Sequence, residues 1–239
     1  MVFAWFSEKF QELLNRNKVF EKLVDDSFGP SQVRYYNAYS SKPVDVRDTL
    51  RFKGASEPLM RGVLKEIGVK DSDDMDSKVE KIRDSVNARL DYISDDVNYM
   101  VPEYWADPYA VYMKKKDDCD GYAILIMALM RLAGIPSWRR RIVCGNVISG
   151  EGHAYVVYFT QKNNMWCVVE GSYLAKLATR QFNVVPYNSS KAYSNVWFTF
   201  NEEKAWSEFP ILFINDKDEV QRAKSKHGTA RRARKQHSY

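Results

Sequence analysis

Apolar residues recur at helical spacing in the first half of the chain and at strand-like spacing in the second. The most regular helical pattern spans residues 79–93, where apolar side chains step by three or four positions. They are Val79, Ile82, Val86, Leu90 and Ile93. Further helices are predicted over residues 2–26, before Gly29-Pro30, and over residues 56–67, which Gly68 ends. The mixed charges of residues 2–26 favour packing on the main domain over binding to a membrane surface.

The helix that organises the chain is predicted to begin at Cys119. Asp118 is a typical N-cap residue, and the apolar run from Ala123 to Ala133 is too continuous for a surface helix. Gly134 supplies a left-handed C-terminal residue, and Pro136 prevents continuation. A thiol in the first helical turn meets the positive end of the helix dipole and unpaired amides, which favour the nucleophilic thiolate. The alternative is a cysteine that packs as a small hydrophobic side chain.

After Pro136 the pattern changes to short runs rich in β-branched and aromatic residues. The predicted strands are Trp138–Val143, His153–Thr160, Met165–Val169 and Val196–Phe200, with one more near Val33–Tyr36. Helices followed by an antiparallel sheet indicate an α+β fold.

Three segments are predicted along the chain. Residues 1–75 form a helical extension and linker, residues 76–215 form the main domain, and residues 216–239 form a disordered basic tail. The tail holds eight Lys/Arg against three Asp/Glu, a balance of +5, which equals the net charge of the whole protein. The tail could therefore contact nucleic acid or an acidic surface through salt-sensitive attraction, or it could serve solubility or packaging.

No stretch of the sequence is long and apolar enough to cross a membrane, and the first ten residues lack a basic signal-peptide start. The three cysteines, an odd number without paired spacing, favour a reducing compartment over a disulfide framework or a structural zinc site. We therefore expect a cytoplasmic protein. The small size and basic tail would suit a phage or mobile-element protein, which would act in the host cytoplasm or in the virion.

A cysteine nucleophile needs a base, and His153 is the one histidine outside the basic tail. It opens a predicted strand, and Glu170 closes the strand that follows. Paired positions across the connecting turn sum to an odd number, and so do 153 and 170. Both side chains are therefore predicted to share one face of the hairpin, where a carboxylate could orient the imidazole.

Taken in this order, the residues resemble the transglutaminase-like superfamily of the papain-like group, and most closely its bacterial transglutaminase-like cysteine proteinases. The W-x-x-P pattern of that family is met by Trp105-Ala-Asp-Pro108. Residues 118–123 meet its G-D-C-[DE]-[DG]-[FY]-A helix start from the second position on, and Asp117 stands where the family usually has glycine. Its later G-H-[AV] is met by Gly152-His153-Ala154, and Glu170 is the acid that ends the next strand. The similarity covers about residues 79–171.

The resemblance implies a papain-like, transglutaminase-like catalytic domain acting on a protein or peptide. Cys119 would attack a peptide or amide carbonyl, His153 would accept the thiol proton, and Glu170 would orient the imidazole. Water would resolve the thioester in a hydrolase, whereas an amine would resolve it in an acyltransferase. A non-catalytic structural or binding module that uses the basic tail is the third alternative.

The resemblance implies an enzyme that requires no cofactor. In some relatives the acidic residues beside the nucleophile bind calcium, and Asp118 and Asp120 match those positions. Two carboxylates supply roughly a third of a calcium shell, so helix capping and hydration are favoured over a calcium site. The backbone N–H of Cys119 and an indole or amide near Trp105 are expected to stabilise the oxyanion. The alternative for Trp105 is a packed lid residue.

Overall fold

The computed structural model describes residues 31–35, 43–54, 56–147, 149–172, 193–207 and 211–213. The predicted helix over residues 2–26 and the predicted disordered tail, residues 216–239, lie outside the described residues. Within the described part of the chain, none of the helices combines the length and the hydrophobicity that crossing a bilayer requires.

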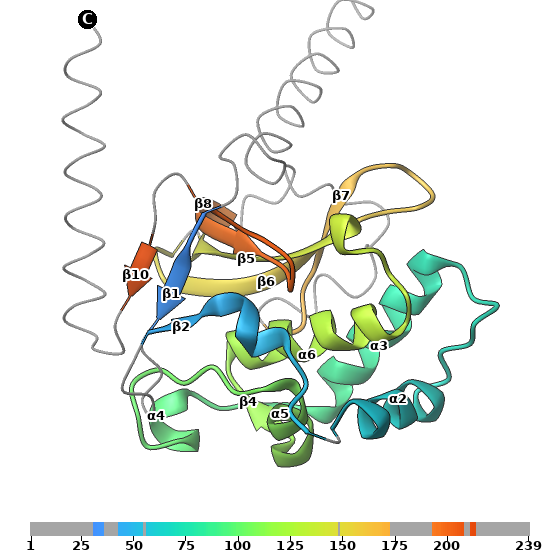
Figure 1. Ribbon diagram of the computed structural model, residues 1–239, viewed down its shortest axis with the longest axis horizontal. Coiled ribbons are helices and arrows are strands. Elements are labelled where there is room, and N and C mark those ends of the chain that lie inside the picture. Colours follow the sequence, from blue (N-terminus) through green and yellow to red (C-terminus); the bar gives the residue numbers. More distant parts are fainter. Residues whose placement is uncertain are drawn as a thin grey trace, which may run out of the picture.

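A five-stranded antiparallel sheet forms one layer of the domain, with strand order β7-β6-β5-β8-β9. The strands are β5 (Arg140–Val147), β6 (Gly152–Phe159), β7 (Trp166–Val169), β8 (Tyr193–Phe200) and β9 (Ala205–Ser207). Helices cover one face of this sheet, so the predicted α+β class is confirmed (Figure 1). Trp138 lies in a short 3-10 helix, η3 (Ser137–Arg139), which delays the start of the first predicted strand by two residues.

The central helix, α6, packs directly on β5 and β6 and is flanked by α3 and α5 (Figure 1). The helices are α2 (Ser56–Glu66), α3 (Met75–Arg89), α4 (Asp95–Asn98), α5 (Pro108–Lys114) and α6 (Cys119–Leu132). Every residue of α6 from Asp120 to Met130 is buried, as the unbroken apolar run predicts. Gly134 adopts φ +81°, a conformation that favours glycine, and so allows the chain to leave α6.

Side-chain caps set the starts of the helices around α6. The side chain of Asp74 accepts a hydrogen bond from the Ser77 N–H at the start of α3, and that of Asp107 accepts one from the Ala110 N–H at the start of α5. Helix α3 begins four residues earlier than its apolar pattern and ends before Ile93. The chain turns at Leu90 to form β3 (Asp91–Tyr92), which pairs in parallel with β4 (Lys116–Asp117). From β4 the chain passes through Asp118 to Cys119, the first residue of α6.

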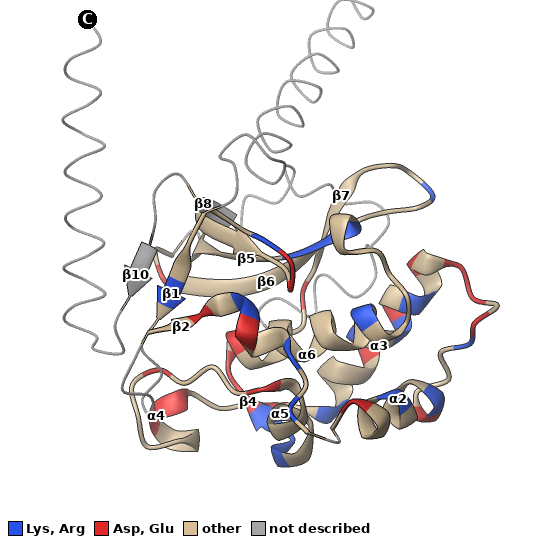
Figure 2. Cartoon of the chain, in the orientation of Figure 1, with Lys and Arg blue, Asp and Glu red and all other residues tan. Residues whose placement is uncertain are grey.

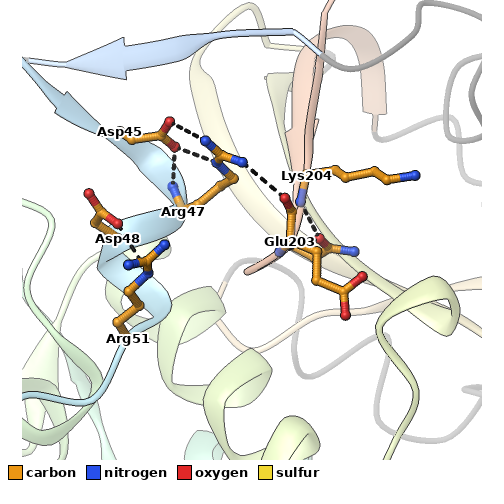
Figure 3. A network of polar contacts seen from close by, with 7 residues as sticks. Asp45, Arg47, Asp48, Arg51, Glu203 and Lys204 are labelled. Carbon is orange, nitrogen blue, oxygen red and sulfur yellow. Dashed lines mark hydrogen bonds and ion pairs between the residues drawn. The ribbon is translucent and has the colours of Figure 1, made fainter.

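The described residues near the N-terminus lie beside β9, at one edge of the main sheet. Strand β1 (Val33–Tyr35) lies between β2 (Val44–Asp45) and β10 (Ile211–Phe213). Arg47, in the 3-10 helix η2 (Val46–Leu50), binds both carboxylate oxygens of Asp45 and donates to the Glu203 carbonyl at 2.9 Å (Figure 3). These contacts tie residues 44–50 to the turn between β8 and β9.

One hydrophobic core spans this junction. Val33, Tyr35 and Val46 are buried in the same cluster as the apolar side chains of α3 and α6. The core therefore draws on both sides of the predicted boundary at residue 75, and the three-segment division of the chain stays a prediction.

Replacing Asp76 by alanine is expected to lower the free energy of unfolding by about 3 kcal/mol. The buried Asp76 carboxylate accepts hydrogen bonds from the Tyr158 hydroxyl at 2.8 Å and from the backbone N–H groups of Gln161 and Lys162 at 2.7 and 2.9 Å. Alanine would leave these donors without their acceptor. Thermal unfolding followed by circular dichroism measures the change, with Asp71→Ala, at an exposed position, as the control. Equal midpoints for the two variants would contradict this role of Asp76.

Candidate active site

Cys119 is the first residue of α6, as predicted, and Asp118 is its N-cap. The cysteine is partly exposed, whereas Cys144 and Cys167 are buried. Its thiol accepts a hydrogen bond from the backbone N–H of Ala154 on β6. The start of α6 thus places the Cys119 thiol beside Ala154, the residue that follows His153.

The pKa of the Cys119 thiol lies well above its ordinary value. Burial is the main cause and the neighbouring Asp118 charge the next, while the Ala154 N–H acts in the opposite direction. The expectation of a thiolate favoured by the helix end is therefore wrong for this arrangement. It took account of the helix dipole, but not of the loss of solvent around the sulfur or of the negative charge of Asp118 beside it.

His153 and Glu170 form a buried pair, with 2.9 Å between Nε2 of the imidazole and Oε2 of the carboxylate. The register places Val157 opposite Val168, so paired positions sum to an odd number as predicted. Glu170 follows the last residue of β7 and reaches back toward His153, near the start of β6. Its other oxygen, Oε1, accepts a hydrogen bond from the Ser172 backbone N–H at 3.0 Å.

Tyr92, on β3, is a further neighbour of the nucleophile. The residue is 56% exposed, and the pKa of its hydroxyl is raised by burial and then by the charges of Cys119 and Asp118. No spacing in the sequence indicates this neighbour, because the parallel pairing of β3 with β4 brings it there.

Trp105 is buried in the core. Its ring centroid lies 5.2 Å from that of Tyr35 and 5.8 Å from that of Phe200. The indole Nε1–H donates to a Glu103 carboxylate oxygen at 2.7 Å. A substrate oxygen would have to replace Glu103 to use this donor, so a direct role of Trp105 in oxyanion binding stays a prediction.

Three carboxylates gather beside the nucleophile. Asp95, Asp118 and Asp120 each place an oxygen within 4.8 Å of the others. Figure 2 shows acidic residues around α4 and β4, on the side where α6 begins. The sequence motif around Cys119 indicates Asp118 and Asp120, but not Asp95, which α4 contributes from 23 positions before Asp118.

This carboxylate cluster is under electrostatic strain. Burial raises the pKa of Asp95 to about 9 and that of Asp118 to about 7. Neighbouring charges add to this effect, chiefly that of Asp118 on Asp95 and those of Glu103 and Asp117 on Asp118. The same two causes raise the pKa of the buried Asp120 well above its ordinary value. Among the described residues, no hydrogen-bond donor reaches Oδ1 of Asp95 or Oδ1 of Asp120. Hard cations such as calcium bind oxygen ligands of this kind, so the cluster fits a divalent cation.

Gly121 allows the start of α6 to approach β4 closely. A Cβ atom at this position would lie 2.3 Å from Cγ of Asp117, well inside contact distance. The pKa of Asp117 is raised to about 6, chiefly by burial, and its carboxylate accepts a hydrogen bond from the Tyr99 hydroxyl at 2.9 Å. The glycine in the D-C-D-G-Y-A motif therefore has a packing role.

Comparison with known protein families agrees with the resemblance seen in the sequence. The family model described as the transglutaminase-like superfamily matches residues 62–171, a segment that holds Cys119, His153 and Glu170. Residues 62–171 belong to the transglutaminase-like superfamily. No curated protein sequence matches this chain significantly.

Several solved structures are similar to this chain. Legionella pneumophila LapG is 15% identical, with a TM-score of 0.49 over 67% of this chain and 84% of that chain. Its calcium-bound form gives 15% identity and a TM-score of 0.47 over 66% and 83%. A candidate cysteine protease from Cytophaga hutchinsonii is 19% identical, with a TM-score of 0.40 over 66% of this chain and 51% of that chain.

Proposed function

We propose that this protein is a cysteine hydrolase that cleaves a peptide or amide bond through a thioester. The observation that supports this most strongly is the buried 2.9 Å contact between His153 and Glu170, next to the strand residue whose N–H binds the Cys119 thiol. A nucleophile, a base and a carboxylate that orients the base form the minimal set for acyl transfer.

In the proposed reaction, His153 takes the proton of the Cys119 thiol as the sulfur attacks the carbonyl carbon. Glu170 accepts the Nε2–H of the imidazole, so Nδ1 is the nitrogen that receives the proton. The tetrahedral intermediate then collapses, the C–N bond breaks, and His153 gives its proton to the departing amine. Water, deprotonated by His153, hydrolyses the thioester and releases the carboxylic acid and the free thiol.

The developing oxyanion needs donors that are already in place. The backbone N–H of Cys119, at the first position of α6, has no partner within its own helix and suits this role. The partly exposed ring of Tyr92 lies where it could contact the substrate beside the sulfur.

The carboxylate cluster is proposed to hold a divalent cation, with calcium the best match to its oxygen ligands. Asp95, Asp118 and Asp120 would supply three oxygens, and backbone carbonyls or water would complete the shell. The bound cation would supply positive charge that offsets the repulsion among these carboxylates. Asp118 would also be held firmly as the N-cap of α6, which fixes the position of Cys119.

Labelling with iodoacetamide tests the nucleophile. In the native protein we expect one modified cysteine, mapped by mass spectrometry to Cys119, because the other two cysteines are buried. Cys119→Ala should remain unlabelled until the protein is unfolded. Labelling of Cys144 or Cys167 at the same rate as Cys119 would contradict a distinct reactive thiol.

Incubation with a cell lysate then tests the reaction itself. New chain termini that form with the wild-type protein and not with Cys119→Ala indicate hydrolysis. Amine-conjugated glutamines would indicate acyl transfer instead. Identical products from both proteins would exclude Cys119 as the nucleophile.

A further inference from the structure

The turn Glu170-Gly171-Ser172 is held by contacts that the proposed reaction does not use. Ser172 donates from its backbone N–H and its hydroxyl to Oε1 of Glu170, at 3.0 and 3.3 Å. These bonds occupy the oxygen that faces away from His153. They restrain rotation of the carboxylate without anchoring the turn to the rest of the domain.

Asn87 provides that anchor from α3. Its side-chain Nδ2 donates to the Gly171 carbonyl oxygen at 2.8 Å, across 84 positions of sequence. Asn87 lies in the last turn of α3, whereas β7 has already ended at Val169. Asn87 thus supplies a hydrogen-bond donor to the Gly171 carbonyl, which lies beyond the residues of β7 that pair with β6.

Helix α6 presses on the same residue from another direction. A Cβ atom on Gly171 would lie 2.8 Å from Cδ1 of Ile126 and 3.2 Å from Cδ1 of Tyr122, so the turn can sit this close to α6 because glycine lacks a side chain. The Tyr122 hydroxyl in turn donates to the Leu90 carbonyl at the end of α3. The turn is therefore held between the two helices.

We propose that Asn87 is a positioning residue that sets the angle of the Glu170 carboxylate, and through it the orientation of His153. A glutamate side chain rotates about three torsions, so its carboxylate stays on one imidazole nitrogen only if its backbone is fixed. The bond from Asn87 fixes the peptide that follows Glu170. This inference rests on the proposed function for its catalytic meaning.

Nuclear magnetic resonance of the full chain tests this role without a substrate. The Nε2–H proton of His153, hydrogen-bonded to a carboxylate, is expected as a separate low-field signal at mildly alkaline pH. Loss of the signal in His153→Gln assigns it among the three histidines of the sequence. In Asn87→Ala we expect this signal to broaden beyond detection, because the imidazole no longer keeps one tautomer and orientation.

Two further variants make the test specific. Asn87→Leu keeps the volume of the side chain and removes the donor, and it should lose the signal as Asn87→Ala does. Ser85→Ala, at another half-buried position of α3, should retain it. A wild-type signal in both Asn87 variants would overturn the proposal, and so would its loss in Ser85→Ala.

The positioning role of Asn87 and the proposed function can be contradicted independently of each other. If Cys119→Ala still yields the wild-type products, the hydrolase assignment fails, but the effect of Asn87 on the His153 signal is measured all the same. If cleavage depends on Cys119 and both Asn87 variants cleave at the wild-type rate with an unchanged signal, the positioning role fails alone.

Discussion

Replacing His153 by glutamine is expected to lower kcat for the cleaved substrate by about 100- to 10,000-fold, the usual contribution of general acid–base catalysis. The raised pKa of Cys119 makes this residue dependent on a base, because little thiolate exists before the proton moves. Glutamine keeps a polar side chain of similar length but cannot accept and return the proton. Single-turnover and steady-state rates on a target identified in the lysate measure the loss.

The same substrate gives a graded comparison at the carboxylate. Glu170→Gln retains an oxygen that can accept the imidazole Nε2–H and loses the charge that stabilises the imidazolium, so a smaller loss than in His153→Gln is expected. His237→Gln, in the basic tail, is the control for the histidine substitution. A His153→Gln protein that cleaves as fast as the His237→Gln control would rule out His153 as the base.

Local signals in the sequence were sufficient to predict the parts of the fold that depend on residues close together in the chain. The N-cap residue type at Asp118, the apolar run and Gly134 define α6 because capping and burial act within a few positions. The alternation of β6 and β7 likewise predicts that His153 and Glu170 share a face, since the side-chain period of a strand is fixed at two.

Residues that reach the site through tertiary packing could not be found in this way. Asp95 and Tyr92 approach Cys119 because β3 pairs with β4, and both strands are only two residues long, too short to leave an apolar pattern. Asn87 lies on α3 and resembles any polar residue of an amphipathic helix. Its contact with Gly171 depends on where β7 ends.

The electrostatics of the site were the least predictable part. The helix dipole favours a thiolate at Cys119, and a sequence alone supports that expectation. Burial and the charge of Asp118 outweigh it, because removal from water disfavours any added negative charge. The same effect acts on Asp118 and Asp120, and this raises the question of what neutralises so many carboxylates in one place.

Calcium at about 100 times its dissociation constant is expected to raise the midpoint of thermal unfolding by roughly 5–10 °C. Binding to the folded state alone at that concentration contributes about 2.7 kcal/mol, and each kcal/mol shifts the midpoint of a chain of this size by about 2–4 °C. The carboxylates of Asp95, Asp118 and Asp120 repel one another in the folded chain, and they are dispersed after unfolding. A cation therefore favours the folded state. Calorimetry with added calcium and with a chelator measures the shift.

The Asp120→Asn variant distinguishes calcium binding at the carboxylate cluster from weak calcium binding elsewhere on the protein. The variant removes one buried carboxylate, so its chelator-treated form should unfold at the wild-type midpoint or higher, while its response to calcium should largely disappear. Asp84→Asn, at an exposed carboxylate of α3, should respond to calcium as the wild type does. An equal calcium shift in Asp120→Asn would show that the ion binds outside this cluster. No shift in the wild type would mean that protons, rather than a metal, neutralise these carboxylates, as the raised pKa values of Asp95 and Asp118 would then require.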